Sequence, residues 1–222
     1  PYDDDSADEE WYYFKSNGKR AENEKITYKS KSYYFDSDGK MLTGWVTYDS
    51  NAVDEANDFV DGKTFYCDET GARLEKNWVY SVEPGVEDDD ADADEYWYYL
   101  KSSGKVANGK QSNVKGQGFV FGNKDDNFGQ MLTNWVGGTK DGDSYKYEEI
   151  GGEDSVAQLS DYASNGVVYY CMYDEDKADG HIQKNKWRKT WRPEDAYEED
   201  EDEDNGTGLK KTVRLTSRIQ MI

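Results

Sequence analysis

Residue types on which catalysis commonly depends are scarce in this chain. Its 222 residues include a single histidine, His181, and only two cysteines, Cys67 and Cys171. His181 lies beside Gly180 among charged residues, without the nucleophile and orienting carboxylate that acid–base catalysis requires. Gly-rich phosphate loops, His-Glu-x-x-His and Cys-x-x-Cys motifs are also missing. We therefore expect no catalytic residue, no cofactor and no enzymatic activity.

Long apolar segments are absent as well. Only 35% of the residues are hydrophobic, and no run approaches the roughly 20 residues of a membrane span, so we expect no membrane insertion. Aliphatic residues are few, whereas 19 Tyr and 7 Trp are present, so aromatic side chains should form most of the core. The chain begins at Pro1 with neither Met nor a signal-like segment, which suggests a piece of a protein with further repeats or domains.

The net charge of −21 comes largely from three acidic runs, residues 3–10, 83–95 and 194–204. None of these runs contains Lys or Arg, and the rest of the chain is close to neutral. We expect the runs to be hydrated spacers or long hairpin loops. Because so acidic a chain repels nucleic acid and anionic lipid, neither is an expected partner.

One sequence pattern recurs along the chain. An aromatic run, a polar turn and a glycine form the copies WYYFKSNGK (11–19), YYFDSDGK (33–40), FYCDETG (65–71) and WYYLKSSGK (97–105), with looser copies at 119–129 and 169–180. A second pattern that ends in Trp follows several of them: MLTGW (41–45), LEKNW (74–78), MLTNW (131–135) and IQKNKW (182–187). Alternating aromatic and polar residues closed by a glycine turn predict short β-hairpins.

The hairpins form two larger units, each with an insertion whose apolar residues are spaced i, i+3, i+6 and i+7. These residues are Val53, Ala56, Phe59 and Val60 in the first unit and Val156, Leu159, Tyr162 and Ala163 in the second. The spacing predicts one short amphipathic helix in each unit. The predicted fold is therefore an all-β, β-hairpin repeat solenoid with short helical insertions and two three-hairpin super-repeats.

The predicted organisation follows from these units. It consists of an acidic linker (1–10), a first three-hairpin unit (11–82), an acidic linker or long hairpin loop (83–95), a second three-hairpin unit (96–191), an acidic linker (192–207) and a basic tail of unknown origin (208–222).

Two segments, SYYFDSDGKMLTGWV (32–46) and WYYLKSSGKVANG (97–109), resemble the cell-wall-binding repeat family of Gram-positive surface and secreted proteins. That family includes choline-binding and glucan-binding repeats, and the resemblance covers roughly residues 11–191. It implies a solenoid whose repeats stack on their neighbours. It also implies a non-catalytic module that attaches a secreted or cell-surface protein to cell-wall polysaccharide, glucan or a choline-decorated polymer. The alternative is a structural spacer or adhesin stalk without a small-ligand site.

The resemblance also implies candidate ligand-binding residues. Flat aromatic faces stack on sugar rings, and cages of Trp and Tyr bind quaternary ammonium through cation–π attraction. In choline-binding repeats the cage combines the Trp that ends one copy with the Trp that opens the next. Only Trp78 and Trp97 fulfil both conditions. The residue that opens the next copy is Thr64 for Trp45 and Val168 for Trp135, and for Trp187 this chain contains no next copy. The candidates are Trp78, Trp97, Trp45, Trp135 and Trp187.

Ligand binding and a stalk make different predictions for these side chains. Binding predicts solvent-facing, paired aromatic residues around Trp78 and Trp97, whereas a stalk predicts that all seven Trp are buried. A core role is the more common one for the remaining Trp, because aliphatic packing is scarce.

Neither the cysteines nor the acidic turn near residue 174 predicts a special site. Cys67 and Cys171 take an inward position in equivalent hairpins of different units, so we expect buried free thiols and not a disulfide. The segment DEDKADG (174–180) departs from a calcium loop, because its third carboxylate and its glycine come one place late and Asn185 stands at position 12. No metal site is expected.

Overall fold

The structure is a computed structural model of the whole chain, and it describes residues 10–50, 52–86, 93–151, 155–174, 178–187 and 189. The chain divides into two compact units, residues 1–107 and 108–222, which are treated separately below. The linker predicted at 192–207, the basic tail, most of the linker at 1–10 and part of the stretch at 83–95 lie outside the described residues. The repeat boundaries given above stay a prediction.

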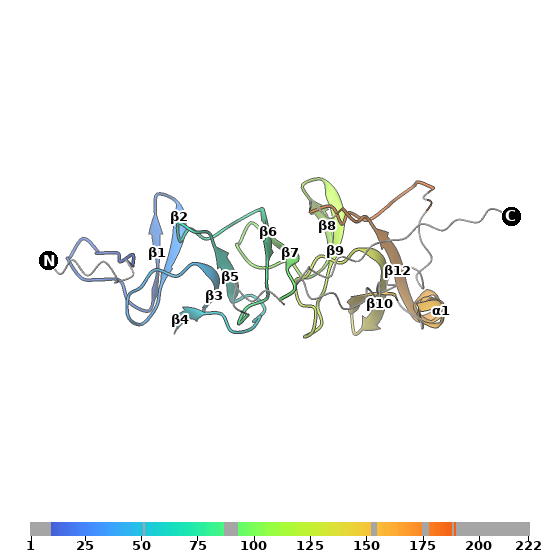
Figure 1. Cartoon of the computed structure of the whole chain (residues 1–222), viewed down its shortest axis with the longest axis horizontal. Coiled ribbons are helices and arrows are strands. Elements are labelled where there is room, and N and C mark those ends of the chain that lie inside the picture. The colour runs from blue at the N-terminus through green and yellow to red at the C-terminus, as the bar shows by residue number, and fades with distance from the viewer. Residues whose placement is uncertain are drawn as a thin grey trace, which may run out of the picture. The chain divides into compact units, whose positions relative to one another are not determined.

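The first unit consists of short antiparallel strands, as predicted. They are β1 (Glu24–Tyr28), β2 (Lys31–Phe35), β3 (Gly44–Tyr48), β4 (Val53–Glu55), β5 (Thr64–Cys67), β6 (Asn77–Ser81) and β7 (Tyr96–Leu100) (Figure 1). They form the pair β1–β2, the three-stranded sheet β4–β3–β5 and the pair β6–β7.

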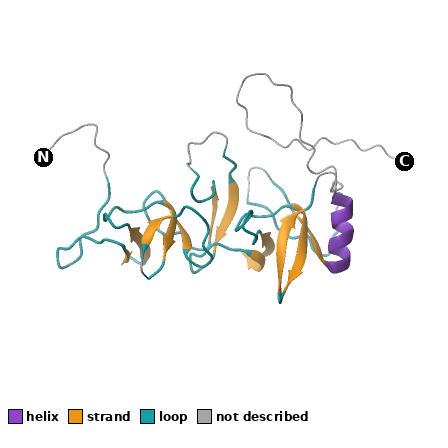
Figure 2. Ribbon diagram, turned by 90° about the horizontal axis from the view of Figure 1, so that it is seen from below, coloured by secondary structure: helices purple, strands orange, loops and turns teal. Residues whose placement is uncertain are grey.

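The second unit adds a helix to its strands. It contains β8 (Gly109–Val114), β9 (Gln117–Phe121), β10 (Asn134–Asp141), β11 (Ser144–Glu149), α1 (Ser155–Asn165) and β12 (Gly166–Cys171). Strands β8 and β9 pair, and the other three form a sheet in the order β11–β10–β12. Helix α1 packs against β10 and β12 (Figure 2). Across the described residues, no helix has the length and apolar character needed to span a membrane.

The six copies of the aromatic pattern are six hairpins, each closed by one β-bridge. The bridged pairs are Phe14–Arg20, Phe35–Met41, Cys67–Arg73, Leu100–Val106, Phe121–Met131 and Cys171–Ile182. We number these hairpins 1 to 6 in chain order. The longer ladders join the segment after one hairpin to the aromatic run of the next, as in β3–β5 and β6–β7. The predicted tandem repeat is thus confirmed in the backbone.

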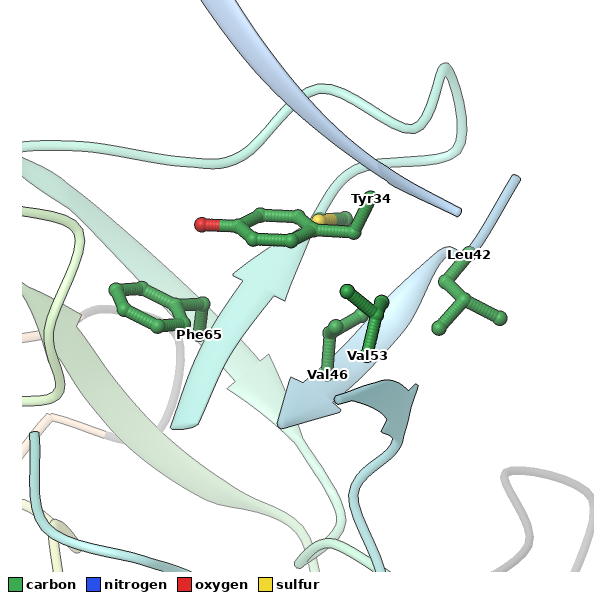
Figure 3. Packing of buried hydrophobic residues seen from close by; sticks show 6 residues of the cluster. Tyr34, Leu42, Val46, Val53 and Phe65 are labelled. Atoms are coloured by element: carbon green, nitrogen blue, oxygen red, sulfur yellow. The ribbon is translucent and has the colours of Figure 1, made fainter. Parts of the chain in front are cut away.

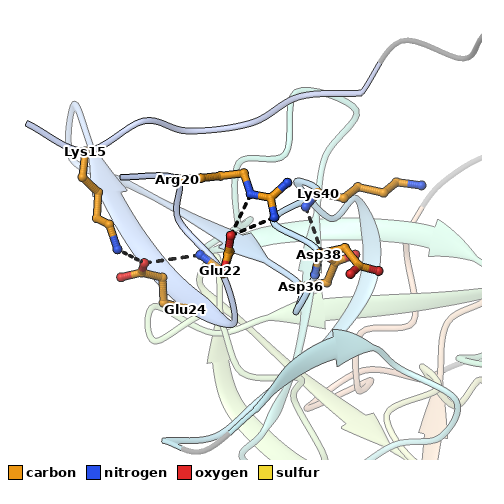
Figure 4. Close-up of polar contacts among 7 residues, drawn as sticks. All are labelled: Lys15, Arg20, Glu22, Glu24, Asp36, Asp38 and Lys40. Carbon is orange, nitrogen blue, oxygen red and sulfur yellow. Dashed lines mark hydrogen bonds and ion pairs between the residues drawn. The ribbon is translucent and has the colours of Figure 1, made fainter. Parts of the chain in front are cut away.

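The turn glycines have the backbone conformation that the repeat requires. Gly18, Gly39, Gly71 and Gly104 have φ values of 75–77°, in the left-handed region that glycine adopts without steric cost. Each donates its N–H to the carbonyl three residues earlier, at 2.7–3.1 Å. In hairpin 2 the Asp36 side chain also accepts the backbone N–H groups of Asp38 and Lys40, both at 2.9 Å (Figure 4). Local turn chemistry therefore fixes each hairpin.

Neighbouring hairpins are joined through one recurring backbone hydrogen bond. The bridge residue after the turn donates its N–H to the residue that opens the preceding hairpin. The pairs are Met41 with the Trp11 carbonyl (2.9 Å), Arg73 with Ser32 (2.8 Å) and Ile182 with Gly118 (2.7 Å). This bond therefore joins hairpins 1, 2 and 3 in the first unit and hairpins 5 and 6 in the second, the neighbour contact that a repeat protein requires.

The core uses aliphatic residues as well as aromatic ones, which corrects the expectation of a mainly aromatic interior. In the first unit one buried cluster joins Tyr34, Leu42, Val46, Val53, Phe65 and Cys67 (Figure 3). In the second a corresponding cluster joins Val120, Leu132, Val136, Tyr147, Cys171 and Ile182. Because strand side chains alternate between faces, the few aliphatic residues of this chain are enough to fill the inward positions.

Only one of the two predicted helices forms. Residues 155–165 are helical, but Val53 begins the strand β4, which is followed by a bend at 57–58 and a turn at 61–63. The Val53 N–H donates to the Asn23 side chain at 2.7 Å, and β4 pairs with the edge of β3. Asn57, Asp58 and Gly62 favour turns over helix, whereas α1 contains good helix formers such as Ala157 and Leu159.

The two cysteines are buried free thiols, as predicted. Burial raises the pKa of the Cys67 thiol from 9.0 to about 12, with a smaller contribution from the neighbouring Asp68 carboxylate. Burial likewise raises the pKa of Cys171. Both thiols act as small core side chains, and both residues are members of a hairpin bridge.

Candidate ligand-binding site

Three equivalent ladders present the Trp that follows a hairpin. In β3–β5, β6–β7 and β10–β12 this Trp lies opposite a Tyr: Trp45 with Tyr66, Trp78 with Tyr99 and Trp135 with Tyr170. Two residues after this Trp along the same strand, the facing pair is Thr47 with Thr64 in β3–β5, Tyr80 with Trp97 in β6–β7, and Gly137 with Val168 in β10–β12. Since residues two apart share a face, only β6–β7 gathers four aromatic side chains on one side.

We call Trp78, Tyr80, Trp97 and Tyr99 the β6–β7 aromatic face. The ring centroids of both facing pairs, Trp78 with Tyr99 and Tyr80 with Trp97, are 5.0 Å apart. The two indoles are diagonal neighbours, with centroids 6.5 Å apart and planes nearly perpendicular at 89°. Tyr80 is 50% exposed and both Trp are half-buried, whereas Tyr99 is buried at 8% exposed, so three of the four rings remain accessible to a ligand.

The opposite side of the same ladder is buried and holds the aromatic face in place. Val79 and Tyr98, which face each other across β6 and β7, are 6% and 0% exposed. The Tyr98 ring also contacts Trp45, at 5.0 Å between centroids. Alternation along the strands therefore anchors one set of side chains in the core and leaves Trp78, Tyr80 and Trp97 accessible on the other side.

Negative charge lies beside this aromatic face. Asp94 and Glu95 precede β7 directly and are exposed. Burial raises the pKa of the Tyr80 phenol, and the carboxylates of Glu95 and Asp94 raise it further. Glu95 precedes Trp97, the cross-strand partner of Tyr80, by two residues, and Asp94 adjoins Glu95, so both carboxylates lie at the start of β7 beside this face, where they favour a cationic group.

Trp45, another predicted site residue, belongs to the core. It is 8% exposed, and its indole N–H donates to the Val82 carbonyl at 2.8 Å. Its ring makes edge contacts with Phe59, Tyr66 and Tyr98 at centroid distances of 4.9–5.0 Å. These neighbours cover the indole on several sides, so its surface is taken up by packing.

The other two predicted Trp are separate from the aromatic face. Trp135 is half-buried against Tyr170, with ring centroids 5.5 Å apart, and its ladder continues with Gly137 and Val168 in place of aromatic residues. Trp187 is fully exposed, and Trp11 is 74% exposed. The stalk hypothesis predicted burial of every Trp, and the described Trp do not fulfil it.

Lysine replaces the ladder Trp at two equivalent positions, a feature that the sequence interpretation missed. Lys25 lies opposite Tyr34 in β1–β2, and its Nζ lies 5.7 Å from the Tyr48 ring centroid. Lys110 lies opposite Val120 in β8–β9, with its Nζ 4.6 Å from the Tyr169 centroid. In the sequence this feature is visible as a Lys at the repeat position that holds Trp in other copies. At both positions the lysine ammonium group lies over a tyrosine ring of the same chain.

His181 has a local structural role. Its Nδ1 pairs with the Asp179 carboxylate, and its Nε2 lies 2.8 Å from the side-chain nitrogen of Gln183. All three residues lie around the hairpin 6 bridge at Ile182. Within the described residues, no group of three or more His, Cys, Asp or Glu side chains is arranged to hold a metal ion.

Comparison with known families agrees with the repeat geometry. Residues 6–19, 26–41 and 92–106 match the family model described as a putative cell wall binding repeat. The third segment includes β7 and therefore Trp97 and Tyr99 of the aromatic face. Three segments of the chain thus match the repeat of this family, and together they make up less than half of its length.

Similar proteins come from streptococci. A putative endo-beta-N-acetylglucosaminidase of Streptococcus pneumoniae serotype 4 is 29% identical over 103 residues, which are 46% of this chain and 12% of that protein. Glucosyltransferase-S of Streptococcus mutans serotype c is 33% identical over 112 residues, 50% of this chain and 6% of that protein. The chain therefore spans a small part of these relatives. The solved structure of choline binding protein F from Streptococcus pneumoniae is 23% identical, with a TM-score of 0.43, over 78% of this chain and 38% of that one.

Proposed function

We propose that the chain is a non-catalytic attachment module that binds a cell-wall polymer through the β6–β7 aromatic face. The observation that carries the proposal is the gathering of four aromatic rings on one side of a single ladder, where Tyr99 is buried beneath the accessible Trp78, Tyr80 and Trp97. Such rings stack on the faces of sugars, and they attract an ammonium group that lies within about 6 Å of a ring centroid. The ligand is a cell-wall polysaccharide, a glucan or a choline-bearing polymer.

The face suits binding because its rings are held before the ligand arrives. Trp78 and Trp97 contact each other and their facing Tyr, and the backbone ladder fixes all four side chains. Side chains that are already ordered lose little conformational entropy on binding, which favours affinity. With Trp45 buried and the β10–β12 ladder lacking a second aromatic pair, β6–β7 is the primary site of the proposal.

The proposal assigns attachment, and no reaction, to this chain. The two curated relatives are named as enzymes, but the similar region is 12% and 6% of their lengths. The module would serve a secreted protein at the cell surface, where further repeats or domains supply other functions. Its net charge of −21 argues against nucleic acid as a partner.

Isothermal titration with choline, purified cell-wall polysaccharide and a soluble glucan tests the proposal. We expect saturable binding of at least one of these ligands. Trp97→Ala should weaken it by roughly tenfold or more, because each aromatic contact of this kind contributes on the order of 1–2 kcal/mol. Trp135→Ala is the matched control, since Trp135 has the equivalent ladder position without the second aromatic pair, and it should retain affinity.

Circular dichroism of each variant verifies that the fold is intact. Absence of binding to all three ligands by the wild-type chain would refute the proposal and favour the stalk. Equal losses in Trp97→Ala and Trp135→Ala would show that the β6–β7 aromatic face is not the site.

A further inference from the structure

The dimensions of the β6–β7 aromatic face fit one sugar ring. Residues two apart on a strand are separated by roughly 7 Å, and neighbouring strands by about 4.8 Å. The four residues of the face therefore occupy a patch of the ladder of roughly 7 by 4.8 Å. Their rings contact one another across the two strands. A pyranose ring offers a flat array of C–H groups that packs on such a surface.

A neutral sugar would gain no attraction from the negative charge beside this face. Asp94 and Glu95 are exposed, precede β7 directly and act on the Tyr80 phenol. A glucan or an N-acetylated glycan gains no attraction from two carboxylates, whereas a ligand with a positive group does. The site thus combines a surface for a ring with a surface for a cation.

Primary ammonium groups are compatible with the tyrosine rings of this chain. The Nζ atoms of Lys110, Lys29 and Lys25 lie 4.6, 5.1 and 5.7 Å from the centroids of tyrosine rings. All three distances fall within the range of cation–π attraction. The aromatic residues of this protein thus accept an –NH₃⁺ group, and the interaction does not require a quaternary ammonium.

We propose that the β6–β7 aromatic face, together with Asp94 and Glu95, binds a glycan that bears protonated amines, such as a glucosamine polymer lacking part of its N-acetyl groups. The rings hold the face of the sugar, and the carboxylates attract its ammonium group. Choline offers a cation without a sugar ring, and a neutral glycan offers a ring without a cation. This inference rests on the proposed function, because it names the ligand class of the same site.

Titration with two oligosaccharides of equal length tests the inference. The probes are the β-1,4-linked tetramers of glucosamine and of N-acetylglucosamine, at about pH 5.5 and at low salt. We expect the glucosamine tetramer to bind roughly tenfold or more tightly than the acetylated one. This advantage should shrink in about 0.5 M salt, where the Debye length falls to a few ångströms.

The double variant Asp94→Asn/Glu95→Gln separates the charge from the aromatic surface. It should lose most of the preference for the amine and retain binding of the acetylated tetramer. The matched control, Asp38→Asn/Glu69→Gln, removes the same charge from two exposed residues of the hairpin 2 and 3 turns and should keep the preference. Trp97→Ala should weaken binding of both tetramers.

Several results would overturn the inference. Equal, salt-independent affinity for the two tetramers would do so and leave the proposed function standing, as would binding of choline with no binding of either tetramer. A tetralysine peptide that binds as tightly as the glucosamine tetramer would show that charge alone is recognised. No binding of any probe, including cell-wall polysaccharide, would instead count against the proposed function itself.

Discussion

Gly71, in the turn of hairpin 3, lies directly against Met41 of hairpin 2, so that a Cβ at position 71 would be 2.4 Å from the Met41 sulfur. The same relation recurs between Gly104 and Arg73, where the corresponding distance to Nε is 2.6 Å. Gly71 and Gly104 therefore each meet two requirements, a left-handed backbone and contact with the bridge residue of the preceding hairpin.

Replacing Gly71 by alanine should destabilise the first unit by two separate effects. The left-handed backbone, with φ of 75°, costs a residue with a Cβ about 1–2 kcal/mol, and overpacking against Met41 adds about 1–3 kcal/mol. Gly44→Ala is the control, because Gly44 has a φ of 66° but no atom within 4 Å of the position that an added Cβ would take. Urea unfolding should show the larger loss for Gly71→Ala, and equal losses would contradict the packing argument.

Two phenylalanines at the same repeat position should respond very differently to truncation. Phe35 and Phe14 are both bridge residues, yet Phe35 is 3% exposed and Phe14 is 65% exposed. Phe35→Ala should lower the free energy of unfolding by about 3–5 kcal/mol through lost burial and a cavity. Phe14→Ala should change it by less than about 1 kcal/mol, close to the usual surface effect. Comparable losses in chemical denaturation would show that hairpin 1 is packed more fully than its exposure indicates.

The hairpins could be predicted from the sequence because their signals are local. The aromatic run and the turn glycine recur in each copy. In hairpin 2, as the pattern predicts, Phe35 lies in the strand and Gly39 lies in the turn. The insertion at 53–60 could not be assigned this way, although its apolar spacing equals that of the helical one. Its conformation depends on the edge of β3 and on the Asn23 side chain, 30 residues away.

The candidate site was predictable in part for the same reason. Trp78 and Trp97 follow from the repeat pattern, but Tyr80 and Tyr99 join them only through the cross-strand register of β6 and β7. Trp45 occupies the same pattern position as Trp78, yet the Val82 carbonyl and three aromatic rings enclose it. Such tertiary contacts are not visible in a repeat alignment.

The cysteines should be unreactive until the protein unfolds. Alkylation and disulfide exchange require the thiolate, and burial raises the pKa values of both Cys67 and Cys171. With Ellman's reagent at about pH 8, we expect native labelling to be at least a hundredfold slower than labelling in guanidinium, where both thiols should react. Rapid labelling of the native chain would show that these hairpins open readily.

Stability should fall in alkaline solution because of buried tyrosines. Burial raises the pKa of Tyr147 from 10.0 to about 12, with smaller contributions from Tyr169 and Tyr145. It raises the pKa of Tyr34 from 10.0 to about 12 as well, against the opposing effect of Arg73. Between about pH 10 and 12 the unfolded chain has therefore lost phenolic protons that the folded chain retains. The free energy of unfolding then decreases as the pH rises, by up to about 1.4 kcal/mol per pH unit for each group.

Tyr147→Phe separates this titration from other effects of alkali. The variant lacks one phenol that ionises only on unfolding, so its free energy of unfolding should decline less steeply than that of the wild type between about pH 10 and 12. Below about pH 9 the two proteins should show parallel dependence on pH, since the phenol is protonated in both states. Urea unfolding at a series of pH values measures both slopes. Identical slopes above pH 10 would mean that the Tyr147 phenol ionises in the folded protein as easily as in the unfolded chain.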